Sequence, residues 1–184
     1  AIENDARIDR NNDGVIQYVI LEGEPGHQDA LIRTENAVDT LKNHGIALEK
    51  IGHGIANWNR GQAANRMQQL IEQHQNKIEL VLANNDDMAL GAIDAYEKKN
   101  FTESTVPSFF GIDGTAVGLE AVSNGKLSGT VYNDKTGQAQ AIVKLSEYLV
   151  LGKSADDLEF TKEKYIYTPY KKVTAENVDM FIDE

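Results

Sequence analysis

Short β-rich runs alternate with helical patterns along most of the 184 residues, and this alternation constrains the fold more than any other feature. Each predicted strand is a brief apolar or β-branched run. Most are followed by a segment in which apolar residues recur every three to four positions. Such a succession forms right-handed βαβ units with parallel strands. We therefore predict an α/β fold, a three-layer sandwich around a mostly parallel central sheet.

The predicted elements have the following bounds. The strands cover Ile16–Leu21, Ala47–Ile51, Ile78–Ala83, Val106–Ile112, Leu127–Tyr132 and an edge strand at Tyr165–Thr168. The helices cover Ala30–His44, Asn59–Gln73, Asp86–Lys99, Ala116–Ser123, Gly137–Leu151 and Ala175–Ile182. Because ligands of such sheets bind at the carboxyl ends of the strands, the residues that follow each strand are the candidates for a site.

Polar side chains follow each of the first five predicted strands. Carboxylates and amides form paired hydrogen bonds with adjacent hydroxyls, and a guanidinium adds a fork of donors. The only tryptophan of the chain also lies there, and its flat face suits the C–H face of a sugar ring. These strand ends predict a site for a neutral polyol. In chain order they supply His27, Asp29 and Arg33, then Trp58, then Asn84 and Asn85, then Asp113, then Asn133.

Each of these residues also has a purely structural interpretation. Asp29 and Arg33 have the spacing of an ion pair on a helix surface. Asp113 precedes a glycine and fits a turn, and a lone Trp58 more often belongs to a core. The sugar interpretation depends on five polar strand ends at equivalent positions. Asn59, Asp86 and Asp87 are candidate N-caps, and His44, His53 and His74 are expected to be solvated or structural.

Composition excludes several classes of function. Lys and Arg number 18 against 29 Asp and Glu, which gives a formal net charge of −11. Nucleic-acid binders need a concentrated basic surface, and phosphate sites favour a Gly-rich loop that these strand ends lack. The absence of cysteine excludes a disulfide scaffold, a thiolate zinc site and a cysteine nucleophile. No apolar run approaches the roughly 18 residues of a membrane-spanning helix.

An oxygen-rich loop precedes the first strand. The run DRNNDG, from Asp9 to Gly14, places oxygen-bearing side chains at alternate positions, and the carbonyl of Val15 is the next donor. An EF-hand needs a glutamate at its twelfth loop position, but Ile20 stands there, inside a predicted strand. Two interpretations stay open: Gln17 and a distant carboxylate complete a cation site, or the loop is a turn that binds nothing. The pattern favours Ca²⁺ over Mg²⁺, which gives up its waters reluctantly.

Together these motifs resemble a known family. The runs DRNNDGVIQ, GEPGHQDALIRT, NW, ANNDDMALGA, GID and GTVYND, in order from Asp9 to about Asn133, are similar to those of the galactose/glucose-binding branch of the type I periplasmic sugar-binding proteins. The resemblance implies a two-lobed receptor outside the cytoplasm, free in the periplasm or lipid-anchored, with a structural calcium ion and no enzymatic activity. Its expected partners are a monosaccharide (glucose or galactose), the permease of an ABC importer and, in some bacteria, a chemoreceptor.

The resemblance also implies roles for individual residues. The implied calcium ligands are Asp9, Asn11, Asp13, Gln17, the Val15 carbonyl and, as a bidentate ligand, Glu79. The implied sugar ligands are His27, Asp29, Arg33, Asn85, Asp113 and Asn133, with Trp58 as the stacking residue. Glu79 would supply the distant carboxylate that the loop requires.

By the same resemblance, the first lobe of the family is missing from this chain, which begins without methionine and is expected to be processed or a piece of a longer protein. Residues 1–133 would form the sugar- and calcium-binding C-terminal lobe. Residues 134–168 would belong to the absent lobe, and residues 169–184 would return to this one. Without the other lobe, an apolar stripe would be exposed, and we expect self-association through it. The stripe consists of Ala139, Ile142, Leu145 and Leu149.

Two other functions remain as alternatives. The effector domain of a sugar-responsive repressor shares the architecture, but the chain has no basic helix-turn-helix and is acidic. An α/β sugar-modifying enzyme would use the Asp86-Asp87 pair or Asp113 as acid, base or metal ligand. The sequence has no G-x-S-x-G elbow and no Ser–His pair, and His27 would be its only candidate base.

Overall fold

The structure, a computed structural model, describes residues 8–99, 101–102, 105–152, 160 and 165–182. Within them the strands are β1 (Ile16–Glu22), β2 (Leu48–Ile55), β3 (Leu80–Ala83), β4 (Ser108–Phe110), β5 (Thr130–Tyr132) and β6 (Lys171–Val173). The α-helices are α1 (Gln28–Asn43), α2 (Arg60–His74), α3 (Asp86–Lys98), α4 (Ala116–Ser123), α5 (Lys135–Val150) and α6 (Asp179–Ile182). A short 3₁₀ turn, η1 (Gln75–Lys77), follows α2.

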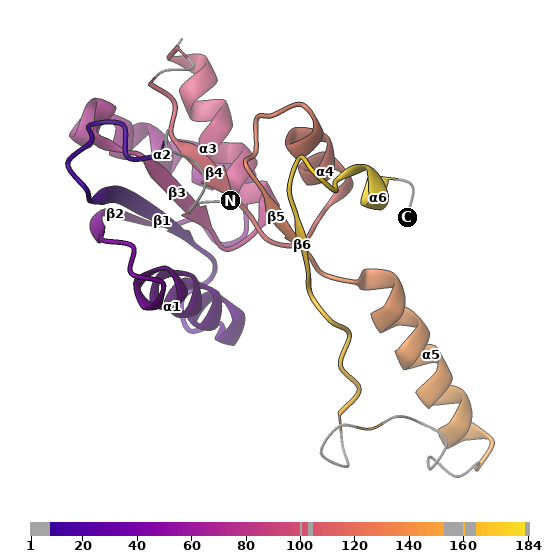
Figure 1. The fold of residues 1–184 in the computed structure, drawn as a ribbon. Helices are drawn as coiled ribbons and strands as arrows, with labels where there is room; N and C mark the ends of the chain where they lie inside the picture. The colour runs from indigo at the N-terminus through magenta and orange to yellow at the C-terminus, as the bar shows by residue number, and fades with distance from the viewer. Residues whose placement is uncertain (1–7, 100, 103–104, 153–159, 161–164, 183–184) are drawn as a thin grey trace.

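The central sheet is mostly parallel, as predicted. Four strands pair in the order β2-β1-β3-β4, all parallel. Two parallel bridges, Phe110 to Gly129 and Asp113 to Tyr132, continue this arrangement to β5, and β6 pairs with β5 antiparallel. Figure 1 shows these strands side by side, with helices on both sides of the sheet. The expected α/β class and layered architecture are therefore confirmed.

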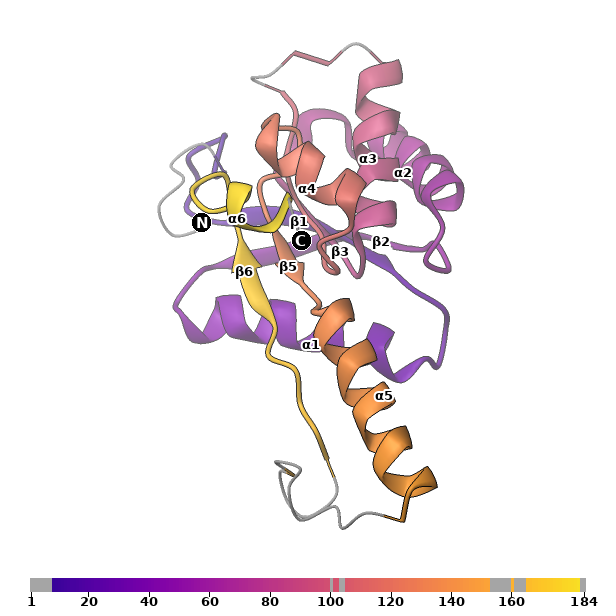
Figure 2. The ribbon, with the colours of Figure 1, turned by 90° about the vertical axis from the view of Figure 1, so that its right-hand side faces the viewer.

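The alternation of side chains along β1 builds two cores. Val19 and Leu21 pack in a large cluster with residues of α2, α3 and α4. Tyr18 and Ile20 point to the opposite face, where a smaller cluster includes residues of α1. This period of two is what a strand buried on both faces requires. In Figure 2, α1 and the α2–α3 pair accordingly lie on opposite sides of the sheet.

Two predicted elements differ from the structure. The predicted edge strand at Tyr165–Thr168 is wrong, because the strand that pairs with β5 is β6, in which Lys171 opposes Tyr132. Among residues 165–170, Tyr165 forms an isolated bridge and residues 166–170 belong to no strand. The predicted last helix, Ala175–Ile182, is reduced to the four residues of α6. A turn precedes it, closed by the Asn177 side chain, which accepts a hydrogen bond from the Thr174 amide at 2.8 Å.

A buried carboxylate joins three segments behind the carboxyl edge of the sheet. Asp86, at the start of α3, is a polar residue of the core and is 0% exposed. It accepts hydrogen bonds from the Thr130 hydroxyl at 2.5 Å and the Thr115 amide at 2.8 Å. A Cβ at Gly118 would fall 2.3 Å from one of its oxygens. Burial raises the pKa of Asp86 to about 6, although these hydrogen bonds favour the charged form.

Replacing this carboxylate should destabilise the fold. Asp86→Ala leaves the part-buried Thr115 amide and the buried Thr130 hydroxyl without their acceptor, at a cost of up to about 1–3 kcal/mol for each unsatisfied group. The neighbouring Asp87 is exposed, so Asp87→Ala should change stability by less than about 0.5 kcal/mol. Urea unfolding of the two variants measures the difference. Equal midpoints would contradict the role assigned to Asp86.

Candidate functional site

The carboxyl edge of the sheet brings most of the predicted sugar-site residues together. Arg33, on α1, is central: its Nη1 donates to the Asn84 carbonyl at 2.9 Å and to Asp113 Oδ1 at 3.2 Å. Its Nη2 lies 4.0 Å from Asp29 Oδ2. The guanidinium therefore links the end of β3 to the loop after β4. Asp113 keeps part of its carboxylate open to solvent, with its side chain 31% exposed.

Trp58 forms one wall of the same site. Its ring is half-buried and makes an edge contact with the His27 ring, with the two centroids 5.2 Å apart. The Arg33 Cζ lies 5.8 Å from the centre of the Trp58 ring, within the range of a cation–π contact. A Cβ at Gly23 would fall 2.3 Å from this ring, so only glycine allows the indole to lie against the end of β1.

The backbone at this edge adopts conformations that are uncommon for residues with side chains. Asn57 and Trp58 are consecutive left-handed residues, with φ of 49° and 61°, and Asp113 has a φ of 122°. Each such residue costs of the order of 1–3 kcal/mol, and such strain clusters at binding sites. The strain here falls on the two loops that present Trp58 and Asp113.

Three predicted ligands have structural partners as well. The Nδ1 of His27 caps α1 by accepting from the Asp29 amide at 3.1 Å. Asn85 caps α3 by accepting from the Met88 amide at 2.9 Å, so the helix cap expected at Asp86 or Asp87 lies one residue earlier. Asn133 accepts a hydrogen bond from Gln138 Nε2 at 2.5 Å. The predicted cap at Asn59 is confirmed by its contact with the Gln62 amide at 2.9 Å.

A polar network lies beneath the site. Its residue Asn84 was among the strand-end candidates, but the hydrogen bonds that it forms and the contact of Glu22 with His53 were not predicted. Asn84, 3% exposed, accepts a hydrogen bond from the Gly23 amide at 3.0 Å and donates to the Thr34 hydroxyl at 3.0 Å. Glu22 Oε2 lies 3.1 Å from Nε2 of His53, a histidine that we expected to be solvated or structural. The available signal was Glu22 itself, an acidic residue directly after an apolar strand run.

Opposing effects act on the charge of Asp113. Burial raises its pKa, while the Arg33 guanidinium beside it lowers it, and burial prevails. The negative charges of Asp87 and Asp29 add to the upward shift. Asp113 is thus a carboxyl group held by one arginine, with part of its side chain open to solvent.

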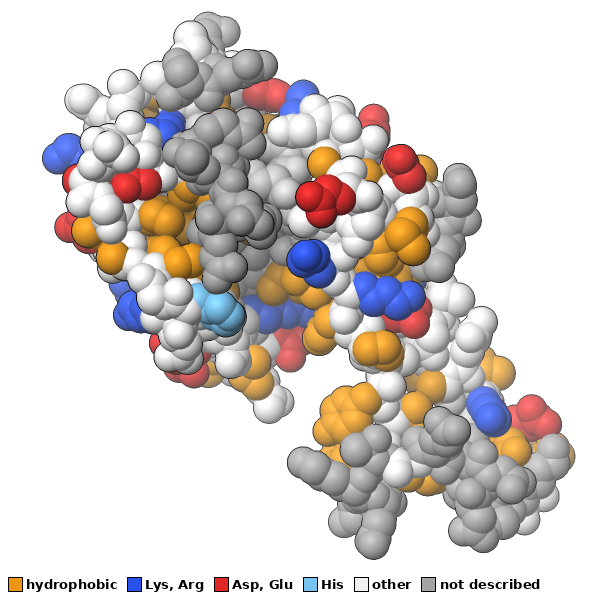
Figure 3. Space-filling model, in the orientation of Figure 1, with side chains coloured by type: hydrophobic (Ala, Val, Ile, Leu, Met, Phe, Trp, Pro, Cys, Tyr) orange, Lys and Arg blue, Asp and Glu red, His pale blue; other side chains and the backbone are white. Residues whose placement is uncertain are grey.

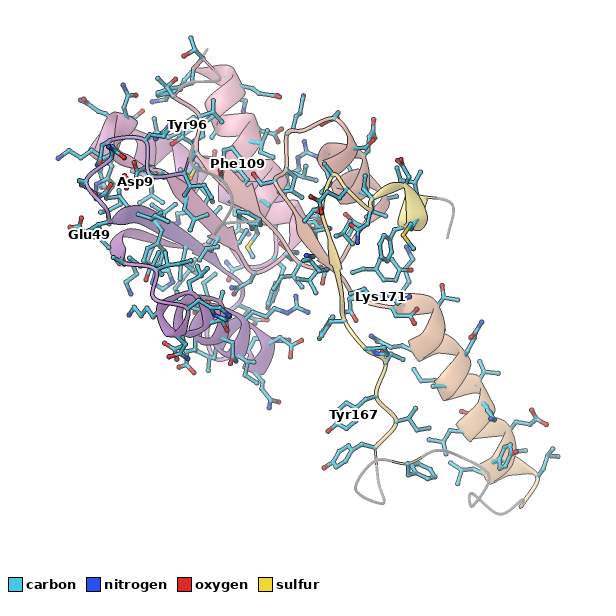
Figure 4. All side chains as sticks on the ribbon, viewed as in Figure 1. Asp9, Glu49, Tyr96, Phe109, Tyr167 and Lys171 are labelled. Atoms are coloured by element: carbon cyan, nitrogen blue, oxygen red, sulfur yellow. The ribbon has the colours of Figure 1, made fainter. Side chains whose placement is uncertain are left out.

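The oxygen-rich loop is joined to Glu79 at the opposite edge of the sheet. Glu79, 2% exposed, accepts hydrogen bonds from the amides of Arg10 at 2.7 Å and Asn11 at 3.1 Å through Oε1. Its Oε2 accepts from the Gln17 amide at 3.1 Å. Figure 4 shows Asp9 and Glu49 of β2 at the same end of the molecule. The structure therefore brings the distant glutamate to the loop.

The side chains of the loop are joined by hydrogen bonds. Asp9 accepts from the amides of Asp13 and Gly14, at 3.2 and 2.9 Å. Asn11 Nδ2 donates to Asp13 Oδ2 at 2.9 Å and to Gln17 Oε1 at 3.0 Å. A hydrogen bond from the Val15 amide lowers the pKa of the Asp13 carboxyl. These oxygens are of the type that Ca²⁺ prefers.

The oxygen donors of this loop and Glu79 are of the chemical type that a hard cation prefers. Within the described ranges, no three His, Asp or Glu side chains are grouped closely enough to hold a metal ion. A calcium shell here would depend on the Asn11 and Gln17 amides and on the Val15 carbonyl in addition to carboxylates. The calcium site stays a prediction.

Comparisons with known proteins agree with these features. A family described as "Periplasmic binding protein domain" matches residues 6–154. The D-galactose/methyl-galactoside binding periplasmic protein of Haemophilus influenzae is 36% identical over 178 residues, which are 95% of this chain and 53% of that protein. A putative rhizopine-binding protein of Rhizobium meliloti is 31% identical over 92% of this chain and 52% of its own length.

A solved structure is similar as well. The ABC transporter solute-binding protein of Bacillus halodurans with bound myo-inositol has 34% identity and a TM-score of 0.77, over 94% of this chain and 55% of that one. The chain thus spans about half the length of the relatives it matches. In the described part of the chain, no helix has both the length and the apolar character needed to cross a bilayer.

Calcium should stabilise the chain through Glu79. A ligand that binds only the folded state adds about 2.7 kcal/mol at a hundredfold excess over its Kd. We expect calcium to raise the melting temperature, and we expect Glu79→Gln and Asp13→Asn to reduce this rise strongly. The exposed Glu35→Gln on α1 serves as the control for a lost charge. The quantity compared between variants is the change in melting temperature that calcium causes. The melting temperature without calcium is not compared, because Glu79→Gln also alters a buried hydrogen-bond network. An unchanged shift in both variants would assign the loop to a turn without a cation.

Proposed function

This chain belongs to the periplasmic binding protein family, and we propose that it forms one lobe of a receptor that binds glucose or galactose for an ABC importer. The observation that carries the proposal is the convergence of Trp58, Arg33 and Asp113 at the carboxyl edge of the sheet. The relative named for D-galactose and methyl-galactoside supports this class of ligand. The myo-inositol in the solved relative is also a cyclic polyol, so a ring bearing several hydroxyl groups is the common feature.

The geometry suits such a ring. The exposed part of the Trp58 indole covers the apolar C–H face, and His27 at its edge limits the tilt of the indole. Asp113 accepts from two adjacent hydroxyls, while Arg33 holds it in place at 3.2 Å and presents further N–H donors. Asn85, Asp29 and Asn133 stand around this pair as additional polar contacts. Asn85 caps a helix through its oxygen, and its Nδ2 donates to the Trp58 carbonyl at 3.4 Å, so the second N–H of Nδ2 is the one left for a sugar hydroxyl.

A second lobe would complete the site. We assign residues 1–133 and 169–184 to this lobe and residues 134–168 to the other, because α5 has no buried residue among its described side chains. In this arrangement the sugar bridges two lobes, and the closed form is the one that the membrane permease recognises. A chemoreceptor would recognise the same closed form. The receptor would act outside the cytoplasm, in the periplasm or tethered at the cell surface.

The calcium ion in this proposal has a structural role. When bound, it would hold the segment from Asp9 to Gln17 against Glu79 and the beginning of β1. The backbone amides that donate to Glu79 already define this junction. The sugar site lies at the other edge of the sheet, so calcium stabilises the lobe without touching the ligand.

The structure gives little support to an enzyme. The acidic pair considered for catalysis does not act as one site, because Asp86 is buried against Thr115 and Thr130 while Asp87 is exposed. The matched relatives are named as binding proteins. We therefore propose no chemical step for this chain.

The single tryptophan reports on the proposed site directly. Titration with D-galactose or D-glucose should change the fluorescence of Trp58 in a saturable way, because the ring of the sugar would lie against the indole. Asp113→Ala should weaken binding at least tenfold without loss of folding. Asp39→Ala, an exposed acidic residue of α1, is the matched control. A wild-type response in Asp113→Ala would remove this residue from the site.

Sugar binding should weaken under mildly acidic conditions. Since burial raises the pKa of Asp113 in the folded chain, its carboxylate takes up a proton above the ordinary aspartate value of about 3.9. The protonated group accepts fewer hydrogen bonds, so affinity falls as pH is lowered from neutral towards this raised pKa. The fluorescence titration repeated between about pH 7 and pH 4 measures the effect. A pH-independent affinity would contradict the assignment of Asp113.

A further inference from the structure

The indole of Trp58 rests on the backbone at the end of β1. Figure 3 shows other hydrophobic side chains at the surface of the arm that contains α5, which we assign to the other lobe. Trp58 differs from them, because its half-buried ring packs against the main core of this lobe. Beneath the ring lies Gly23, a buried residue directly after β1. The position of the indole is therefore set within this lobe.

Gly23 lies under one face of the indole. A Cβ at Gly23 would fall 2.3, 2.4 and 2.5 Å from Cζ2, Cε2 and Cη2 of Trp58, which are consecutive atoms of its six-membered ring. Such similar distances to three neighbouring atoms place the Cβ above the ring plane, because an approach at the edge would leave the two outer atoms clearly farther away than the middle one. A ligand ring that stacks on Trp58 must therefore use the opposite face.

Space, and not backbone conformation, is the reason for a glycine at position 23. The φ of Gly23 is not positive, whereas the nearby Gly26 has a φ of 79°. At Gly26 no atom lies within 4 Å of the place of a Cβ. Gly26 thus allows a left-handed turn, and Gly23 makes room for the indole. Alanine fits the backbone of Gly23, so its main cost would be the contact with the ring.

The backbone on both sides of this contact is fixed by hydrogen bonds. The Gly23 amide donates to Oδ1 of Asn84 at 3.0 Å, and Asn84 is itself buried. The Ala56 amide donates to the Glu22 carbonyl at 2.8 Å, which ties the loop that carries Trp58 to the end of β1. A side chain at position 23 would therefore displace the half-buried indole more readily than the backbone.

We propose that Gly23 is a positioning residue of the candidate site, because its missing side chain sets the depth of the Trp58 indole and the clearance left for a ligand ring. A methyl group at Gly23 would move the ring from 2.3 Å to the 3.4 Å of an ordinary contact, a displacement of about 1 Å. The ring would move away from β1, into the space of a stacked ligand. Binding groups need to be held within about 0.5 Å, so this displacement is large. The clearance for a sugar rests on the proposed function, whereas the depth of the indole does not.

The fluorescence of the only tryptophan reports the depth of the indole without a ligand. Gly23→Ala should shift the emission maximum to longer wavelength and increase quenching by acrylamide, because the displaced ring loses contact with the core. Gly61→Ala adds the same methyl group to an exposed position of α2, where its nearest neighbour would be 3.3 Å away. This control should leave the spectrum unchanged. An unchanged spectrum in a folded Gly23→Ala protein would overturn the proposal.

A double-mutant cycle then tests whether the indole is the group that excludes a side chain at position 23. Gly23→Ala should lower the urea midpoint of the wild-type chain. This loss should largely disappear in a Trp58→Ala background, which lacks the three ring atoms. Equal losses in both backgrounds would overturn the proposal. If Gly23→Ala fails to fold, recovery of folding in the Trp58→Ala background supports the proposal, and failure in both backgrounds overturns it.

Calorimetric titration with D-galactose separates this proposal from the proposed function. If the wild-type chain binds the sugar, Gly23→Ala should weaken binding at least tenfold, and Gly61→Ala should change it by less than about twofold. Wild-type affinity in Gly23→Ala would overturn the link between the depth of the indole and the ligand. A wild-type chain that binds neither D-galactose nor D-glucose would contradict the proposed function, while the fluorescence and the double-mutant cycle still decide the role of Gly23.

Discussion

The parallel register of β1, β3 and β4 is the constraint on which the rest of this structure depends. It places the ends of these strands at one edge, so that residues far apart in the sequence meet there. Arg33 uses this proximity directly, since it bonds the Asn84 carbonyl after β3 and Asp113 after β4. The same register brings the amino end of β3 beside that of β1, and Glu79 thereby reaches the loop before Gln17. One topological feature thus creates both candidate sites, at opposite edges of the sheet.

Rigidity at the carboxyl edge comes from buried polar groups behind it. Asp86 ties the start of α3 to Thr115 and Thr130, on the two segments that flank the Asp113 loop. Asn84 and Glu22 form a second network under Arg33 and Gly23. These contacts hold Trp58 and Asp113 in backbone conformations that residues with side chains seldom adopt. Preorganisation of this kind lowers the conformational entropy that the protein loses when it binds a small ligand with several hydroxyl groups.

The sequence predicted the sheet and the membership of its carboxyl edge, because strand periodicity and strand-end polarity are local signals. The position of β6 was not predictable in the same way. Tyr165–Thr168 alternates like a strand, and only the pairing with β5 shows that Lys171–Val173 is the segment that forms one. The cap of α3 was misplaced by one residue because Asn85 and Asp86 are both good caps, and only burial shows that Asp86 faces the core. The Glu22–His53 contact depends on pairing between strands. The calcium and sugar ligand sets came from resemblance and remain predictions.

The most direct test of the account is to map the ligand onto the chain by NMR. A ¹⁵N-labelled sample with calcium would be titrated with D-galactose, with D-mannitol as an open-chain polyol for comparison. We predict that the signals of Gly23, the Trp58 indole, Asn85 and Gly114 shift on galactose addition, while those of the α2–α3 surface do not. Shifts confined to residues outside the carboxyl edge, or identical shifts with the open-chain polyol, would contradict a sugar site built by Trp58, Arg33 and Asp113.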